Sequence, residues 1–136
     1  MVKLQWLDSF SIGIKSIDDD HKRILQVMQD VQTAVENHDY TLCTSLLDDL
    51  VELGSAHFLS EEKYLAKVSY PYIEEHILYH QELLLKIKSV RVICNDANSQ
   101  GGLEKCFDGM AEFLVDDILA GDLQFKSYLQ ARGLVK

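Results

Sequence analysis

The sequence predicts an all-α protein, an antiparallel up-down four-helix bundle with an irregular N-terminal arm and a short C-terminal helix. Apolar residues recur at steps of three and four along four long segments, which is the period of an amphipathic helix. Short connections join these segments, as in a bundle whose sequential helices are neighbours. No segment alternates apolar and polar residues over the length of a β-strand. The 136 residues, 47% of them apolar, suffice for a single domain with its own core.

The first 17 residues mix aromatic and apolar side chains without a helical repeat, so we expect an irregular arm packed on the body. Three aspartates, Asp18 to Asp20, follow the arm, and we expect them to cap a first helix over residues 18–37. The inner face of this helix is marked by a stripe of apolar residues: Ile24, Leu25, Met28, Val31 and Val35.

The remaining helices are predicted over residues 40–67, 71–94 and 103–120, with a short helix over 122–130. Pro71 suits the first position of a helix, and a polar loop over residues 95–102 separates the third helix from the fourth. In the second helix we expect Leu42, Leu46, Leu50 and Leu53 to face inward, and in the third helix Ile73, Ile77, Leu84 and Ile87. All these segments belong to one predicted domain over residues 1–136.

Charge and composition exclude several classes of function. A net charge of −9 and a pI near 4.9 disfavour binding to nucleic acid or to an anionic membrane surface. No apolar run approaches the roughly 20 residues of a spanning helix, and the N-terminus lacks the apolar stretch of a signal peptide. The three cysteines form no Cys-x-x-Cys pair, which favours reduced thiols and a cytoplasmic location.

Polar side chains interrupt the apolar stripes of all four helices. A single buried imidazole or carboxylate is usually a satisfied core residue, but burying several is costly unless they are paired or bind metal. Because the stripes of a bundle converge, these groups predict a metal site, and their imidazole-rich chemistry suits iron, zinc or copper. No His-Glu-x-x-His motif is present, so a zinc-peptidase interpretation fails. The groups are His21, His57, Glu61, His76, His80 and Asp117.

A family resemblance rests on the order of these motifs along nearly the whole chain. Trp6, Ile12-Gly13 and Ile17-Asp18 precede His21, and the sequence continues with His57-Phe58-x-x-Glu61-Glu62, His76-x-x-x-His80 and Ile118-x-x-x-Asp122. This pattern resembles the hemerythrin family, the bacterial hemerythrins in particular. The resemblance implies a four-helix bundle that binds O₂ reversibly at two non-haem iron ions joined by an oxo or hydroxo bridge.

The resemblance also implies a role for each matching residue. His21 and His57 would bind one iron ion, and His76 and His80 the other. Glu61 and Asp122 would bridge the two ions, with a kink at Gly121 turning Asp122 inward. Asp117 stands where the family has a histidine, and we expect it to bind iron as a carboxylate. Phe113, Leu114 and Ile118 would line the O₂ pocket.

The presence of Asp117 at a position where the family has a histidine has a consequence for function. A carboxylate in place of an imidazole lowers the net charge of the oxidised site from roughly +2 to roughly +1, which favours the higher oxidation state. We therefore expect faster autoxidation than in all-histidine relatives, and a role in oxygen or redox sensing or in O₂ delivery. The ligand would be O₂ or another small diatomic or anionic molecule, and a signalling domain or chain is a candidate partner. The alternative is a di-iron enzyme: a peroxidase, an oxidase or a nitric-oxide-reducing protein.

Overall fold

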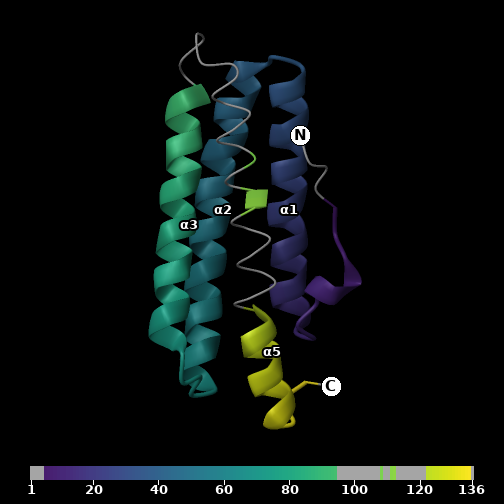
Figure 1. Cartoon of the computed structure of the whole chain (residues 1–136), viewed down its shortest axis with the longest axis vertical. Helices are drawn as coiled ribbons and strands as arrows, with labels where there is room; N and C mark the ends of the chain where they lie inside the picture. Colours follow the sequence, from purple (N-terminus) through teal and green to yellow (C-terminus); the bar gives the residue numbers. More distant parts are fainter. Residues whose placement is uncertain (1–4, 95–107, 109–110, 113–121, 136) are drawn as a thin grey trace.

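The computed structural model describes residues 5–94, 108, 111–112 and 122–135, and every regular element within them is helical (Figure 1). The prediction of an all-α protein is therefore confirmed. Most of the predicted fourth helix, over residues 103–120, lies outside the described residues. The elements are the 3₁₀ helix η1 (Asp8–Phe10) and the α-helices α1 (Lys15–Glu36), α2 (Tyr40–Lys67), α3 (Ile73–Cys94) and α5 (Asp122–Ala131).

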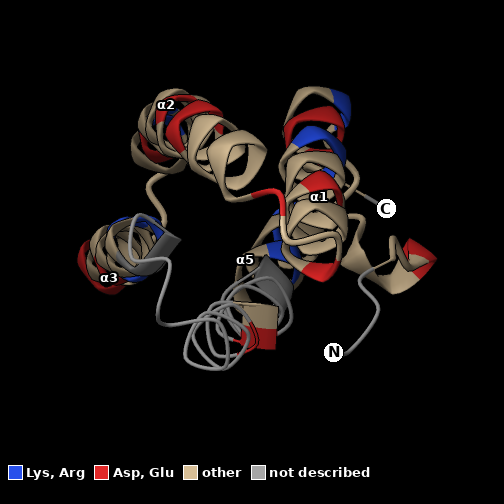
Figure 2. Cartoon of the chain, turned by 90° about the horizontal axis from the view of Figure 1, so that it is seen from above, with Lys and Arg blue, Asp and Glu red and all other residues tan. Residues whose placement is uncertain are grey.

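The three long helices lie side by side, and α2 packs against both α1 and α3. The α1–α2 connection lies at one end of the molecule and the α2–α3 connection at the other (Figure 1). Viewed from above, α1, α2 and α3 occupy three corners of a square, and α5 lies toward the fourth (Figure 2). No described helix combines the length and the apolar content that crossing a membrane would require.

Local backbone and capping features mark where the long helices begin and end. The Asp39 carboxylate accepts a hydrogen bond of 3.1 Å from the Leu42 backbone N–H and so caps the start of α2. His38 and Ser69 follow the ends of α1 and α2 with a φ of 57°, the left-handed conformation common just after a helix. Helix α3 begins at Ile73, two residues after the start that Pro71 predicted.

The start of α1 differs from the prediction. The helix begins at Lys15, three residues early, and no side chain caps it. Asp18 instead lies inside the first turn, where its carboxylate reaches back to the arm. It accepts hydrogen bonds from the Ser11 hydroxyl at 2.7 Å, the Ile12 N–H at 2.9 Å and the Gly13 N–H at 3.3 Å. The expected capping role is therefore wrong for Asp18, which fastens the arm to α1.

The arm packs on the body through its aromatic and apolar side chains. Phe10 and Ile12 are buried, and the Trp6 ring meets Phe10 edge-on at 5.6 Å with the Lys22 ammonium 5.1 Å from the Trp6 ring centre. Gly13 has a φ of +90°, and a Cβ at this position would lie 3.2 Å from the Cβ of Val135. The arm and the C-terminal segment are thus in close contact.

The buried faces of α2 and α3 differ in phase from the predicted stripes. In α2 the buried side chains include Cys43, Leu47 and Leu50, whereas Leu42 is 47% exposed, so its expected inward position is wrong. Among the α3 side chains that the structure describes, the buried ones are His76, His80, Leu83 and Ile87. Three residues expected to face inward, Ile73, Ile77 and Leu84, are only half-buried. Both helices carry apolar residues around more than half of their circumference, so the spacing of leucines alone selects the wrong centre of the face.

A cluster of buried apolar residues fills the end of the molecule at which α5 lies (Figure 1). It joins the arm, α1, α2 and α5 through Ile12, Ile17, Leu65, Tyr70, Phe125 and Leu129. The Tyr128 hydroxyl donates to the backbone carbonyl of Val68 at 2.6 Å and also lies 3.0 Å from that of Ser69. These contacts tie α5 to the α2–α3 connection and place the cluster beside the polar residues described next.

Candidate metal centre

Five of the predicted site residues meet in the interior of the bundle. His21 comes from α1, His57 and Glu61 from α2, and His76 and His80 from α3. None is more than 6% exposed, and the carboxylate of Glu61 is 1% exposed. The spacing of four residues within α2 and within α3 puts each pair of side chains on one helix face. Three helices therefore supply one buried cluster of polar atoms.

The carboxylate of Glu61 lies at the centre of this cluster and divides it in two. Its Oε2 atom lies 2.8 Å from Nε2 of His57 and 3.3 Å from Nε2 of His21. Its Oε1 atom lies 2.5 Å from Nε2 of His76 and 3.4 Å from Nε2 of His80. Each oxygen thus faces its own pair of imidazoles.

The same division appears in the ring contacts. The rings of His21 and His57 meet at 4.6 Å and those of His76 and His80 at 4.5 Å, both nearly perpendicular. In each group, one candidate ligand atom from each residue lies within 4.8 Å of the others. The geometry is that of two neighbouring three-ligand sites that share one carboxylate.

The donor atoms fit a pair of metal ions. Nitrogen and oxygen ligands sit about 2.0–2.2 Å from an ion such as zinc, so neighbouring ligands at angles of roughly 90–110° lie about 3–3.5 Å apart. Most of the separations between Glu61 and the imidazoles are close to this range. Although His57 Nε2 and Glu61 Oε2 are 2.8 Å apart, neither forms a well-directed hydrogen bond with any of the described residues. Buried polar atoms without such bonds require an explanation, and a shared cation supplies one.

Electrostatics favour an ionised carboxylate at the centre of the cluster, and they also favour the protonated form of His57, whose proton a bound metal ion would have to displace. Burial acts to raise the pKa of Glu61, but the four imidazoles around it outweigh burial and hold that pKa well below its ordinary value. The carboxylate therefore stays ionised. Burial acts to lower the pKa of His57, and the carboxylates of Glu61 and Asp20 overcome this effect and raise it.

Two acidic residues lie behind the imidazoles, on the side away from Glu61. The Asp20 carboxylate lies 3.0 Å from Nδ1 of His57, and the Glu62 carboxylate lies 3.7 Å from Nδ1 of His80. Reasoning from the sequence missed the Asp20 contact, because this contact joins residues 37 positions apart on two helices. The Glu62 side chain is 21% exposed, so its carboxylate is still reached by solvent.

Aromatic rings complete the surroundings of the cluster. Phe58 stacks on His80 with the ring centres 4.0 Å apart and the planes 6° from parallel. Tyr70, which is buried, meets His76 edge-on at 6.3 Å. These rings cover the imidazoles of α3 and keep water away from them.

The other predicted positions stand as follows. Asp117 and the predicted O₂-pocket residues Phe113, Leu114 and Ile118 lie outside the described residues. Asp122 begins α5, and its side chain also lies outside them. His38, the remaining histidine, is exposed just after the end of α1.

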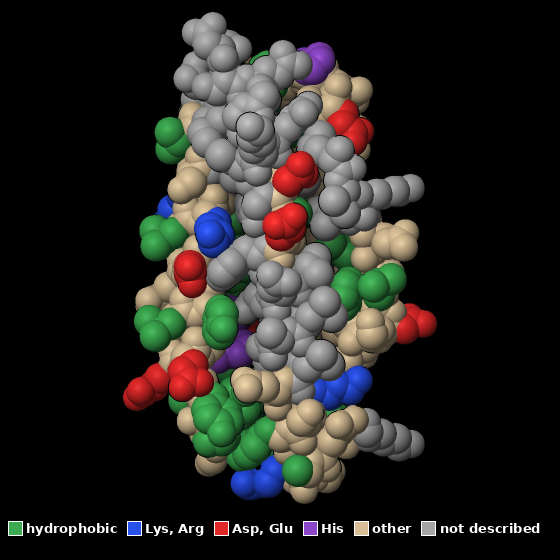
Figure 3. Space-filling view, in the orientation of Figure 1, with side chains coloured by type: hydrophobic (Ala, Val, Ile, Leu, Met, Phe, Trp, Pro, Cys, Tyr) green, Lys and Arg blue, Asp and Glu red, His purple; other side chains and the backbone are tan. Residues whose placement is uncertain are grey.

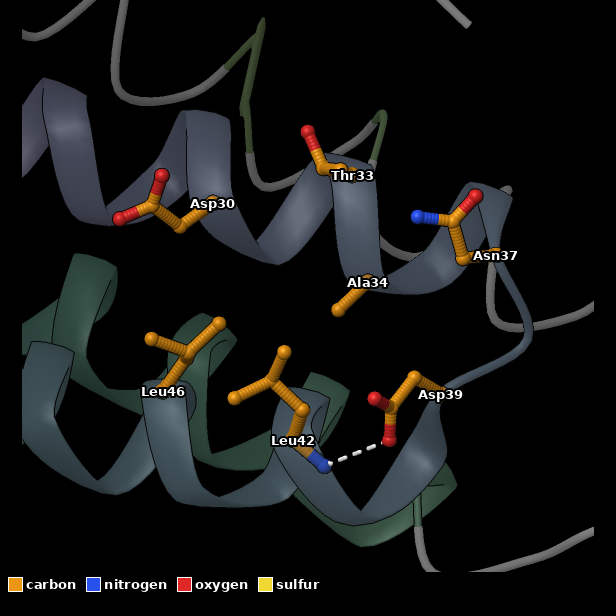
Figure 4. Close-up of a pocket in the computed structure, with 7 residues that line it drawn as sticks. All are labelled: Asp30, Thr33, Ala34, Asn37, Asp39, Leu42 and Leu46. Atoms are coloured by element: carbon orange, nitrogen blue, oxygen red, sulfur yellow. Dashed lines mark hydrogen bonds between the residues drawn. The ribbon is translucent and has the colours of Figure 1, made fainter.

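A separate groove lies between α1 and α2, near their connection (Figure 4). Its volume is about 290 Å³, and its lining residues are Asp30, Thr33, Ala34, Asn37, Asp39, Leu42 and Leu46. Leu46 is the lining residue of α2 closest in sequence to His57, and about 16 Å of helix rise separates these two positions. The Asp39 carboxylate is engaged in capping α2. The groove is therefore not part of the candidate metal centre.

Comparison with known proteins gives one consistent family. Residues 12–125 match the family model described as the hemerythrin HHE cation binding domain. The chain is 26% identical over 124 residues to the bacteriohemerythrin of Clostridium acetobutylicum, a match that covers 88% of this chain and 96% of the relative. It is 26% identical over 126 residues to the myohemerythrin of Theromyzon tessulatum, with 92% of each chain covered. A match at 26% identity to the bacteriohemerythrin of Stenotrophomonas maltophilia covers 68% of this chain and 60% of that longer relative.

Proposed function

Because the chain belongs to the hemerythrin family, whose members bind a non-haem di-iron centre and take O₂ as a small ligand, we propose that it binds O₂ at the candidate metal centre. The observation that carries this proposal is the division of the buried Glu61 carboxylate between two pairs of imidazoles. A single metal site would need only one of these pairs. Two pairs on two oxygens of one carboxylate suit two ions held side by side.

The proposed ligands follow this geometry. His21 and His57 would hold one iron ion, His76 and His80 would hold the other, and Glu61 would be shared by both. Asp122 is proposed as a second bridging carboxylate, and Asp117 as a carboxylate ligand at the position where the family has a histidine. Phe113, Leu114 and Ile118 are the proposed lining of the O₂ pocket.

The residues around the cluster prepare it to bind metal. Hydrogen bonding between Asp20 and Nδ1 of His57 holds the ring proton on Nδ1, which leaves the Nε2 lone pair directed at the site. The low exposure of all five residues excludes bulk water and strengthens the interactions inside. When bound, the two iron ions would supply the electrons that pass to O₂ on binding and would take them back on its release.

The wider architecture is part of the proposal. We propose one domain over residues 1–136, in which helix 103–120 completes an antiparallel up-down bundle with α1, α2 and α3. The proposed location is the cytoplasm. The proposed use of O₂ binding is oxygen or redox sensing or O₂ delivery, with a signalling domain or chain as a candidate partner.

A metal count combined with an absorption spectrum of the aerobic protein tests the proposal. We expect two iron ions per chain and a near-ultraviolet band from an oxo-bridged diferric pair. Glu61→Gln should lower the iron content to one ion or fewer, because it removes the shared anionic ligand. Glu52→Gln, a matched control at an exposed glutamate of the same helix outside the cluster, should keep two. A colourless protein with one zinc ion per chain would overturn the proposal.

The Asp117 position gives a second test, directed at function within the family. If its carboxylate favours the oxidised site, the O₂-loaded protein should lose its absorption sooner than the Asp117→His variant in a stopped-flow measurement. Equal lifetimes would show that the charge argument is wrong.

Asp117 also supports a second candidate function, a di-iron peroxidase, oxidase or nitric-oxide-reducing enzyme. Turnover of peroxide with a reducing dye, compared with reversible O₂ uptake by the same preparation, separates the two functions. Multiple turnovers that Glu61→Gln abolishes would favour the enzyme.

A further inference from the structure

The outer face of α3 carries a row of large apolar side chains that the bundle leaves uncovered. Leu78, Leu85 and Val92 are 62%, 64% and 67% exposed, the three highest values among the large hydrophobic residues that the structure describes. They lie on the side of the helix opposite the buried His80 and Leu83. In Figure 3, hydrophobic side chains recur down the edge of the molecule formed by α3.

The spacing of this row is that of a helix–helix seam. Leu78, Leu85 and Val92 are seven residues apart, so successive members lie about 10 Å apart along the axis and drift by about 20° around it. A seven-residue repeat is the pattern by which one helix packs along another. The row therefore has the geometry of a surface that receives a helix.

The charges beside the row select the occupant and its direction. At about 100° per residue, Glu82 and Lys86 lie on one side of Leu85, and Gln81 and Lys88 lie on the other. Suppose that α3 of a second molecule packs antiparallel to this helix, with the pair centred on Leu85. Each side of the row then meets the same side of the other helix. Glu82 therefore faces Lys86 of the other molecule, and Gln81 faces Lys88. A parallel pair would set Lys86 against Lys88, which is repulsive.

From this we propose that the α3 row of Leu78, Leu85 and Val92 is a homodimer interface, occupied by α3 of a second copy in the antiparallel direction. Helix α3 has 22 residues and is about 33 Å long, so one helix pair buries an area near the lower limit of specific interfaces. We therefore expect a weak dimer, with a dissociation constant on the order of 10 µM.

Sedimentation velocity of the full chain between about 1 and 300 µM tests the interface. The wild type should pass from monomer to dimer over this range, and Leu85→Glu should stay monomeric throughout. The matched control is Leu59→Glu, a leucine of α2 that is 56% exposed and lies outside the row, and it should dimerise like the wild type. A wild type that stays monomeric at 300 µM, or a control that loses the dimer as fully as Leu85→Glu, would overturn the proposal.

A second variant tests the direction of packing. Glu82→Lys should weaken an antiparallel dimer about tenfold, because it sets two lysines against each other across the seam. In a parallel pair the same side chain faces Gln81, so an unchanged or stronger dimer would show that the antiparallel arrangement is wrong. Circular dichroism of each variant confirms that the monomer is folded.

Discussion

Removing the carboxylate of Asp18 should release the N-terminal arm from α1. This side chain accepts three hydrogen bonds from three consecutive arm residues, and the bond from the Ile12 N–H is buried. A hydrogen bond to a charged group contributes about 1.5–3 kcal/mol, and a buried donor left without a partner costs about 1–3 kcal/mol. The bonds from Ser11 and Gly13 are part-buried and contribute less.

We therefore expect Asp18→Ala to lower the free energy of unfolding by about 2–4 kcal/mol, and Asp18→Asn, which keeps one carbonyl acceptor, by about half as much. Such a loss is a large share of the roughly 5–15 kcal/mol of a typical domain. Urea unfolding of the metal-free protein, followed by circular dichroism, measures it. Trp6, the single tryptophan, lies in the arm, and its fluorescence should shift to longer wavelength when the arm is released.

Asp19→Ala is the matched control because it removes the same charge one residue away. No described contact joins the Asp19 side chain to the arm, so we expect a loss of about 0.5 kcal/mol or less. If Asp18→Ala and Asp19→Ala cost the same, the effect belongs to the charge near the helix start and not to the arm contacts. An unchanged Trp6 spectrum in Asp18→Ala would also contradict the reasoning.

Three further changes have defined outcomes. Gly13→Ala should lower the free energy of unfolding by about 1–3 kcal/mol, because it forces a side chain into a left-handed conformation and against Val135; urea unfolding checks this, and no loss would contradict it. Tyr128→Phe should cost about 1–2 kcal/mol in the same assay, because it removes the hydroxyl bonded to the α2–α3 connection. Asp20→Asn should weaken iron binding about tenfold in competition with a chelator, because it removes the carboxylate that orients His57; affinity equal to that of the wild type would show that the contact has no such role.

The helical class and the grouping of site residues could be predicted from the sequence because both depend on local periodicity. A four-residue step puts His57 over Glu61 and His76 over His80 whatever the rest of the chain does. Because both pairs interrupt apolar stretches, they were expected to face inward, and the structure buries all four. The chemistry of the donors then indicates a metal.

Features that depend on how one helix meets another could not be predicted in this way. The contact of Asp20 with His57 requires the relative rotation and height of α1 and α2, which the pattern within either helix does not contain. The reach of Asp18 into the arm requires the start of α1 at Lys15, where no capping residue marks the boundary. An aspartate near a helix start usually caps the helix. Here the backbone N–H groups of the irregular arm bind the Asp18 carboxylate instead.

Helix α3 shows why periodicity alone cannot assign a face. Its apolar residues lie on both sides, so the sequence permits more than one inner face, and the imidazoles rather than the leucines mark the side that is buried. A helix that lies at the surface of a bundle normally keeps its outer side polar. The exposed row of Leu78, Leu85 and Val92 departs from that rule, and these side chains do not pack in the core. A second copy of the chain would explain why this apolar row lies on the outer face. Packing two α3 helices together would turn the exposed row into a buried one.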